Sequence, residues 1–270
     1  VGLAAALPAS AGVLERIKET GTFKIGYRAA AKPYSYRNEN GQPAGYIVDL
    51  CLEVATAVRA EVSDKVHVEY VLVPADQRFE SLRDGKIDIL CDPSSVTIPR
   101  REMVDFSLPT FLDGASVLYR TGKPVQRFED LAGKRIGVLD GTTTERVLRE
   151  SLGLLNLQAD IVPVRDHRSG VDLLTANKVD AYFADRAIIA AILNEGGRPG
   201  FQLSKQYFSY ETYAHALPRD DGAFRLLVDR TLARLYRTGR INAILARTFG
   251  QAPLDEMLKA MIVINSLPDK

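Results

Sequence analysis

Charged residues follow the ends of the alternating apolar segments in this sequence, and their types favour the binding of an anion. The carboxyl ends of parallel strands meet at the edge of a sheet where ligands bind, so these side chains are expected to converge. Guanidinium groups pair with carboxylates through charge-assisted hydrogen bonds. The pocket therefore suits a ligand with more than one carboxylate, and an acid in it can hold an ammonium group. The charged candidates are Arg28, Arg78, Arg100, Asp166, His167 and Asp185.

A glycine and two threonines, Gly141, Thr142 and Thr143, separate a predicted strand at residues 135–139 from a predicted helix at residues 144–152. The first N–H groups of a helix have no partner within the helix and carry partial positive charge. Such a turn is a seat for a carboxylate or a phosphate. A threonine before a helix is also a common N-cap, so this motif alone does not establish a site.

Each charged candidate also has an ordinary structural explanation. Arg100 lies in a charged stretch typical of a solvated helix face, and Arg78 fits the exposed side of a short helix. Asp185 fits an ordinary helix cap. Their common placement at strand ends is the observation that favours a binding site.

Sequence motifs of common enzymes are absent. The sequence contains no GxSxG, no HExxH, no GxxxxGK[ST], and no GxGxxG after a strand. Its three separated histidines and two cysteines offer no recognisable metal site. We therefore predict a binding protein with no catalytic residues, no metal and no cofactor.

The elements that would position these residues alternate between strands and helices. A first set of strands and helices is followed by a second, which predicts two α/β lobes, each a mainly parallel sheet flanked by helices. The helical residues 224–249 need an apolar surface, which the first sheet provides. Lobe one is then residues 13–113 plus 212–270 and lobe two is residues 114–211, with two crossover segments and a ligand cleft between them. The predicted strands are residues 23–27, 66–72, 87–91, 135–139, 161–164 and 179–183.

The overall composition agrees with a globular binding protein. The 270 residues carry 35 basic and 34 acidic side chains, a balance unlike that of nucleic-acid-binding proteins. No apolar run reaches the 18 or so residues that span a membrane. Residues 1–12 are small and apolar and include an A-x-A sequence, so we expect the remnant of a secretion signal, with a frayed terminus as the alternative. Cys51 and Cys91 fit a disulfide and two buried thiols equally well.

The sequence resembles the family 3 extracellular solute-binding proteins of ABC transporters, especially their glutamate/aspartate-binding branch. The resemblance covers residues 13–249, most of the chain. Several motifs occur in the family's order, which is more specific than any single motif. These stretches are residues 14–22, 33–36, 45–50, 104–107, 128–134, 141–143 and 166–167, together with Arg100 and Asp185.

The resemblance implies a role for each candidate. Arg100 would clamp the α-carboxylate of an amino acid, and the donors of Ser95 and Thr143 would assist it. Asp185 would receive the α-ammonium group. Around the side-chain carboxylate the resemblance places three cations, which are Arg28, Arg78 and His167.

Two residues depart from the pattern of this branch. Ala75 and Pro93 stand where similar proteins carry serines. Pro93 still offers a carbonyl to the ammonium group, but each change removes a hydroxyl, and one hydrogen bond contributes about 1 kcal/mol. These changes affect the strength of binding or the choice of ligand. A cysteine pair also occurs in part of the branch, which now favours a disulfide between Cys51 and Cys91.

The prediction as a whole is a monomeric periplasmic receptor that closes on glutamate or aspartate and delivers it to the membrane permease of an ABC importer. Two alternatives stay open. One is an enzyme on the same scaffold, similar to cyclohexadienyl dehydratases, in which an acid protonates a leaving hydroxyl group. The other is the ligand-sensing domain of a receptor.

Overall fold

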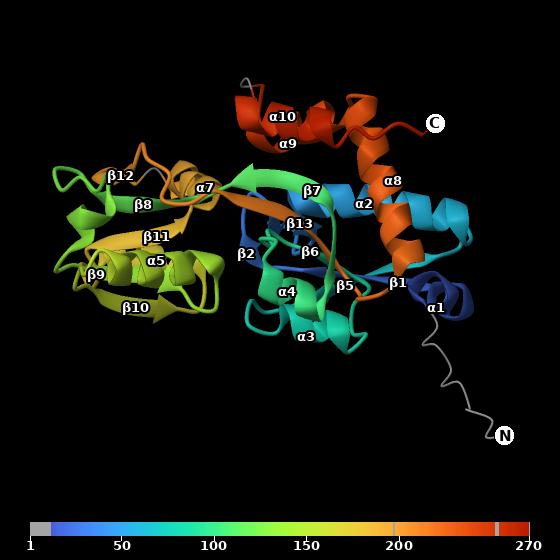
Figure 1. The fold of residues 1–270 in the computed structure, drawn as a ribbon, viewed down its shortest axis with the longest axis horizontal. Coiled ribbons are helices and arrows are strands. Elements are labelled where there is room, and N and C mark those ends of the chain that lie inside the picture. The colour runs from blue at the N-terminus through green and yellow to red at the C-terminus, as the bar shows by residue number, and fades with distance from the viewer. Residues whose placement is uncertain (1–11, 197, 252–253, 270) are drawn as a thin grey trace.

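A computed structural model of the protein describes residues 12–196, 198–251 and 254–269. The predicted signal remnant, residues 1–12, lies outside these residues except for Gly12, whose carbonyl accepts a hydrogen bond from the Arg16 amide. Two five-stranded sheets lie side by side, with the chain passing between them twice (Figure 1). No helix in the described ranges is long and apolar enough to cross a membrane.

The first sheet combines N-terminal and C-terminal strands. β1 pairs in parallel with β5 and β6, whereas β13 pairs antiparallel with β6 and β7. In spatial order the strands are β5 (His67–Leu72), β1 (Thr22–Tyr27), β6 (Ile89–Cys91), β13 (Glu211–Leu217) and β7 (Asp105–Asp113).

The second sheet has the same arrangement of parallel and antiparallel pairs. β9 pairs in parallel with β10 and β11, and β8 pairs antiparallel with β11 and β12. In spatial order the strands are β10 (Asp160–Val164), β9 (Arg135–Leu139), β11 (Ala181–Asp185), β8 (Ala115–Arg120) and β12 (Phe201–Leu203). In both sheets the antiparallel pairs belong to strands that adjoin the crossovers, so each sheet is mixed.

Helices cover both sheets. The first sheet carries α1 (Val13–Thr20), α2 (Tyr46–Glu61), α3 (Arg78–Arg83), α4 (Ile98–Met103), α8 (Gly222–Arg237), α9 (Arg240–Phe249) and α10 (Glu256–Ile264). The second carries α5 (Thr143–Leu154), α6 (His167–Thr175) and α7 (Arg186–Gly196), and a 3₁₀ turn (Phe128–Leu131) precedes β9. One apolar core joins α2, α8 and α9 to β1, as the sequence predicted for the C-terminal helices (Figure 1).

A small antiparallel sheet follows β1. It consists of β2 (Ala30–Ala31), β3 (Ser35–Arg37) and β4 (Pro43–Ala44). The clustered prolines, glycines and polar residues of this region limit strand length, because proline removes a ladder donor and glycine weakens extended structure. The small sheet follows the carboxyl end of β1, and its strand β2 contacts α6, which packs on the second large sheet.

The two crossover segments touch each other at Gly114, which joins β7 to β8. A Cβ atom at this position would lie 1.8 Å from the carbonyl oxygen of Ser209. The neighbouring Ala115 amide donates to the Ser209 hydroxyl over 3.0 Å, and the Phe208 amide donates to the Ala115 carbonyl over 2.8 Å. Glycine therefore permits the close approach of the two segments that connect the sheets.

Candidate ligand-binding site

A cavity lies between the two sheets, at the carboxyl ends of their parallel strands. It is lined by residues of β2, α3, α4, β9, α5, α6, β11 and α7, together with the residues that directly follow β1 and β6. The predicted ligand-binding residues all line this cavity, and they are Arg28, Arg78, Pro93, Ser95, Arg100, Thr142, Thr143, His167 and Asp185. The structure thus brings together residues that lie as far apart as 157 positions in the sequence, from Arg28 to Asp185.

The first sheet contributes three guanidinium groups. Arg28 directly follows β1, Arg78 is the first residue of α3, and Arg100 lies in α4. Arg78 and Arg100 both lie against the ring of Phe79, with guanidinium carbons 4.6 and 4.9 Å from its centroid. Arg100 donates from Nη1 to the carbonyl of Ser95 over 2.8 Å. Burial, and then the neighbouring charge of Arg78, lower the pKa of Arg100 to about 10.

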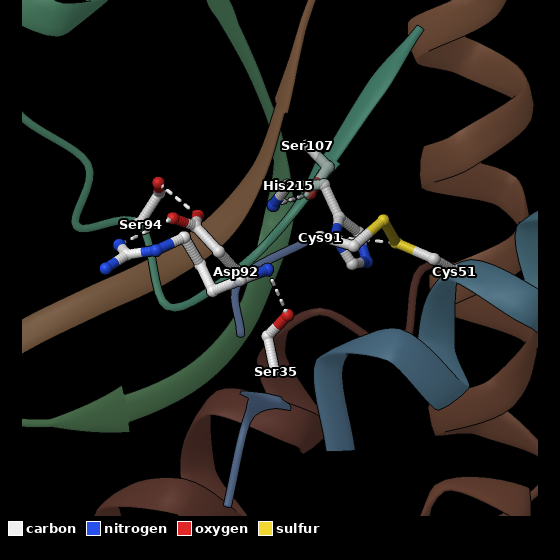
Figure 2. The surroundings of a disulfide bond; sticks show 8 residues. Ser35, Cys51, Cys91, Asp92, Ser94, Ser107 and His215 are labelled. Carbon is white, nitrogen blue, oxygen red and sulfur yellow. Dashed lines mark hydrogen bonds and ion pairs between the residues drawn. A yellow bond between two sulfur atoms is a disulfide. The ribbon is translucent and has the colours of Figure 1, made fainter. Parts of the chain in front are cut away.

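An acid that the sequence analysis did not select lies among these arginines. Asp92, 1% exposed, directly follows β6 and lines the cavity. Its Oδ2 atom is 3.8 Å from Nη1 of Arg28 and 3.5 Å from Nε of Arg78. Its Oδ1 atom accepts a hydrogen bond of 2.5 Å from the Ser94 hydroxyl, as Figure 2 shows. Arg78 also donates from Nη1 to the carbonyl of Ala75.

The second sheet contributes the start of α5. Gly141 has a φ of 68°, a left-handed conformation that turns the chain from β9 into the helix. The Thr142 hydroxyl accepts from the Glu145 amide over 3.1 Å and donates to the Leu139 carbonyl over 2.7 Å. Thr142 is therefore an N-cap, so its hydroxyl is already used. The amides of Thr143 and Thr144 stand in the first turn, where no intrahelical partner exists.

Ser95 and Thr143 meet across the gap between the two sheets. Their hydroxyl oxygens lie 3.0 Å apart, and both side chains are buried. Both hydroxyls donate to one carboxylate oxygen of Glu211, Thr143 over 2.6 Å. Glu211 is the first residue of β13, so a carboxylate on the crossover joins the predicted donors of both sheets.

Asp185, the last residue of β11, lines the cavity from the second sheet. It accepts a hydrogen bond of 2.9 Å from the Thr144 hydroxyl. Burial, followed by the nearby carboxylates of Glu211 and Asp113, raises the pKa of Asp185 to about 7. An ammonium group in the cavity would favour the ionised form, because an opposite charge within a few ångströms lowers a carboxyl pKa.

His167 is the one predicted cation that carries no charge. Burial, and then the charge of Arg28, lower the pKa of His167 to about 3, so the imidazole is neutral. Its Nδ1 atom lies 2.9 Å from the hydroxyl of Tyr182. The expectation of a histidine cation was wrong, because sequence placement does not reveal the cost of burying charge. His167 faces the cavity as a hydrogen-bonding group.

A disulfide joins α2 to the end of β6, next to the cavity. Cys51 and Cys91 are bonded, with Cα atoms 6.3 Å apart, so the pairing favoured by the resemblance is present (Figure 2). The Nδ1 atom of the buried His215 lies 3.4 Å from the Cys51 sulfur. These three side chains are close enough to hold a metal ion, but the bonded sulfurs are not thiolates and do not offer that coordination. The bond fixes the strand end that carries Asp92.

Comparison with known proteins shows the family of this chain. Residues 23–251 match the bacterial extracellular solute-binding proteins, family 3. The chain belongs to this family. Members of the family bind amino-acid ligands and deliver them to ABC permeases. This solute-binding protein also has the predicted fold class of two α/β lobes.

Two curated relatives share most of the length of this solute-binding protein. An L-glutamate/L-aspartate-binding protein of Pseudomonas aeruginosa is 31% identical over 93% of the chain and 87% of its own length. A glutamate/aspartate import solute-binding protein of Escherichia coli is 25% identical over 87% of the chain and 78% of its own length. These names describe the relatives and do not identify the ligand of this chain.

A solved structure bears on the alternative of an enzyme. The ancestral amino acid-binding protein AncCDT-1, a precursor of cyclohexadienyl dehydratase, superposes with a TM-score of 0.78. It is 25% identical and covers 88% of this chain and all of its own, 100%. The scaffold is therefore shared by binding proteins and the lineage of an enzyme.

Asp92, Thr144 and Glu211 are polar residues of this region that sequence reasoning missed. Asp92 directly follows a predicted strand, so the rule that selected Arg28 and Asp185 also applied to it. Glu211 offered no such signal, because its position depends on how the second crossover returns to the first sheet.

Proposed function

We propose that this protein is the periplasmic receptor of an ABC importer and that it binds an acidic amino acid, glutamate or aspartate, by closure of two lobes. The observation that carries the proposal is the cavity itself, which is lined by three guanidinium groups and by Asp185. Such a set suits a molecule with two carboxylates and one ammonium group. The two glutamate/aspartate-binding relatives support the same ligand class.

Each part of the ligand has a proposed partner. The α-carboxylate binds Arg100 and the amides of Thr143 and Thr144, where the start of α5 adds partial positive charge. The ammonium group binds Asp185, with the Pro93 carbonyl beside it. The side-chain carboxylate binds Arg28 and Arg78, and the neutral His167 contributes a hydrogen bond.

Closure would move lobe one, residues 13–113 plus 212–270, against lobe two, residues 114–211, about the crossovers at Gly114. Contacts across the gap support a closing motion. Ser95 meets Thr143, and Nζ of Lys32 lies 2.5 Å from a carboxylate oxygen of Glu195, in a pocket that shares His167 with the cavity. A ligand held between Arg100 and α5 interacts with both lobes only in the closed form. That difference in affinity shifts the population toward closure.

Isothermal titration of the purified protein tests this proposal directly. Glutamate, aspartate, glutamine and arginine are titrated separately, after denaturation and refolding to remove any ligand carried through purification. We expect saturable binding of glutamate or aspartate, with weaker binding of glutamine and none of arginine. Preference for arginine, or no binding of any amino acid, would reject the assignment.

A second candidate is a dehydratase that uses the same cavity. A pKa of about 7 keeps the Asp185 carboxyl partly protonated near neutral pH, which a proton-donating acid requires. Incubation with prephenate or arogenate, followed by product chromatography, distinguishes the two functions. Turnover that disappears in an Asp185→Asn variant would establish the enzyme, whereas amino-acid binding without turnover supports the receptor.

A further inference from the structure

We infer that Asp92 determines ligand specificity, because it shares Arg28 and Arg78 with the ligand and thereby sets the charge of the cavity. The inference rests on the proposed function, since it concerns how the same site distinguishes acidic from neutral amino acids. It adds a residue with no assigned role and an electrostatic rule for the choice of ligand.

The position of Asp92 is fixed on several sides. The preceding residue, Cys91, ends β6 and is tied to α2 by the disulfide. The Ser94 hydroxyl donates to Oδ1 (Figure 2). The Ser94 amide donates to the Asp92 carbonyl over 2.8 Å. Because the side chain is only 1% exposed, its carboxylate cannot move into solvent without a rearrangement of this loop.

The ion pairs of Asp92 do not use up its arginine partners. Both approach the same oxygen, Oδ2, at 3.8 Å from Arg28 and 3.5 Å from Arg78. These separations exceed the 2.7–3.2 Å, approximately, of a good N–H···O hydrogen bond. The Nε atom of Arg78 is buried and has no hydrogen-bond partner within the described ranges. Both guanidinium groups can therefore accommodate a second carboxylate.

The charges that line the cavity can be counted by residue. Three guanidinium groups are opposed by the carboxylates of Asp92 and, in its ionised form, Asp185. His167 is neutral, and Glu211 lines the adjoining groove behind Ser95 and Thr143.

The cavity is left with one net positive charge, which an acidic amino acid neutralises. A neutral amino acid would leave one buried charge without a partner, which is unfavourable. Without Asp92 the cavity would carry two net positive charges, so Asp92 weakens the attraction for an acidic amino acid and limits its preference over a neutral one.

Charge-altering variants test the inference through the ratio of the Kd values for glutamine and glutamate. Asp92→Asn keeps the shape of the side chain and its contact with Ser94 but adds one net positive charge. We expect glutamate to bind at least tenfold more tightly and glutamine to change less than threefold, so the ratio rises. Asp76→Asn is the matched control, because Asp76 is an exposed acid that acts on Arg28 from outside the cavity. It should change neither Kd more than threefold.

A double variant separates charge from positioning. Arg28→Gln removes one positive charge and is expected to lower the ratio at least tenfold. Asp92→Asn combined with Arg28→Gln restores the original net charge, so its ratio should return to within threefold of the parent. If Asp92 only positions Arg28, the double variant will behave like Arg28→Gln alone. That result, or an unchanged ratio in Asp92→Asn, would overturn the inference.

Failure of the inference and failure of the proposed function give different results. If the parent protein binds none of the amino acids, both fail. If the parent binds glutamate but the ratio does not follow the charge of the variants, only the role of Asp92 fails. Circular dichroism and thermal unfolding confirm that each variant is folded before its titration is interpreted.

Discussion

Removal of the Arg100 side chain tests most directly whether this residue binds the α-carboxylate of the ligand. The Arg100→Ala variant should fold, because the guanidinium group makes one hydrogen bond, to the Ser95 carbonyl, and otherwise packs against Phe79. Its lowered pKa of about 10 shows that burial and the charge of Arg78 disfavour the cation in the unliganded protein. The folded state therefore depends little on this charge.

Binding, in contrast, should weaken strongly. A carboxylate about 4 Å from a guanidinium group gains about 4 kcal/mol at an effective dielectric constant of roughly 20. The amides of Thr143 and Thr144 would still bind the ligand and would recover part of this energy. A net loss of about 3 kcal/mol corresponds to a Kd roughly a hundredfold higher.

Titration calorimetry with glutamate measures this change, and Arg101→Ala is its matched control. Arg101 is the next residue of α4, is exposed, and lies over Phe106 instead of the cavity. We expect its Kd to stay within threefold of the parent, with unfolding temperatures similar for both variants. If Arg100→Ala binds glutamate as tightly as Arg101→Ala does, Arg100 does not hold the α-carboxylate.

Three further outcomes follow from the structure. The ammonium group of the ligand needs ionised Asp185, whose pKa is about 7, so the affinity for glutamate should fall about tenfold per pH unit below pH 7. Calorimetric titrations at pH 8, 7, 6 and 5 check this expectation, and an affinity that does not change with pH would contradict it. Replacing both Cys51 and Cys91 by serine should lower the free energy of unfolding by roughly 4 kcal/mol, because the disulfide closes a loop of 40 residues. Urea unfolding measures this loss, and an unchanged unfolding midpoint would refute the prediction. Gly114→Ala should separate the crossovers and lower stability by about 1–3 kcal/mol. Gly222→Ala, at the exposed start of α8 where a Cβ atom would meet nothing within 4 Å, should not have this steric cost, and equal thermal unfolding of the two variants would argue against a tight crossover contact.

The location of the site could be predicted from the sequence because it depends on topology. Once residues 23–27, 87–91, 135–139 and 179–183 are assigned as strands, their carboxyl ends must share sheet edges. Arg28, Thr142 and Asp185 follow such ends, and the structure brings them to one cavity. This argument needs neither side-chain conformations nor accurate helix boundaries.

Properties that depend on burial could not be predicted in this way. The neutrality of His167 and the raised pKa of Asp185 result from the packing of both lobes around the cavity. The antiparallel strands β7, β8 and β13 were not predicted as strands, because their pairing is decided by long-range contacts. Glu211 was missed for the same reason, since only the register of β13 with β7 places it beside Ser95.

The shifts of Arg100 and Asp185 have opposite directions but a related cause. Burial disfavours the charge of each group, and nearby groups of the same sign disfavour it further, Arg78 for Arg100 and Glu211 for Asp185. A zwitterionic amino acid reverses both effects in one binding event, because its carboxylate reaches the arginine while its ammonium group reaches the acid. A ligand lacking either group would leave one of these charges without a partner, so recognition of the amino-acid backbone follows from the cavity before the side chain is considered.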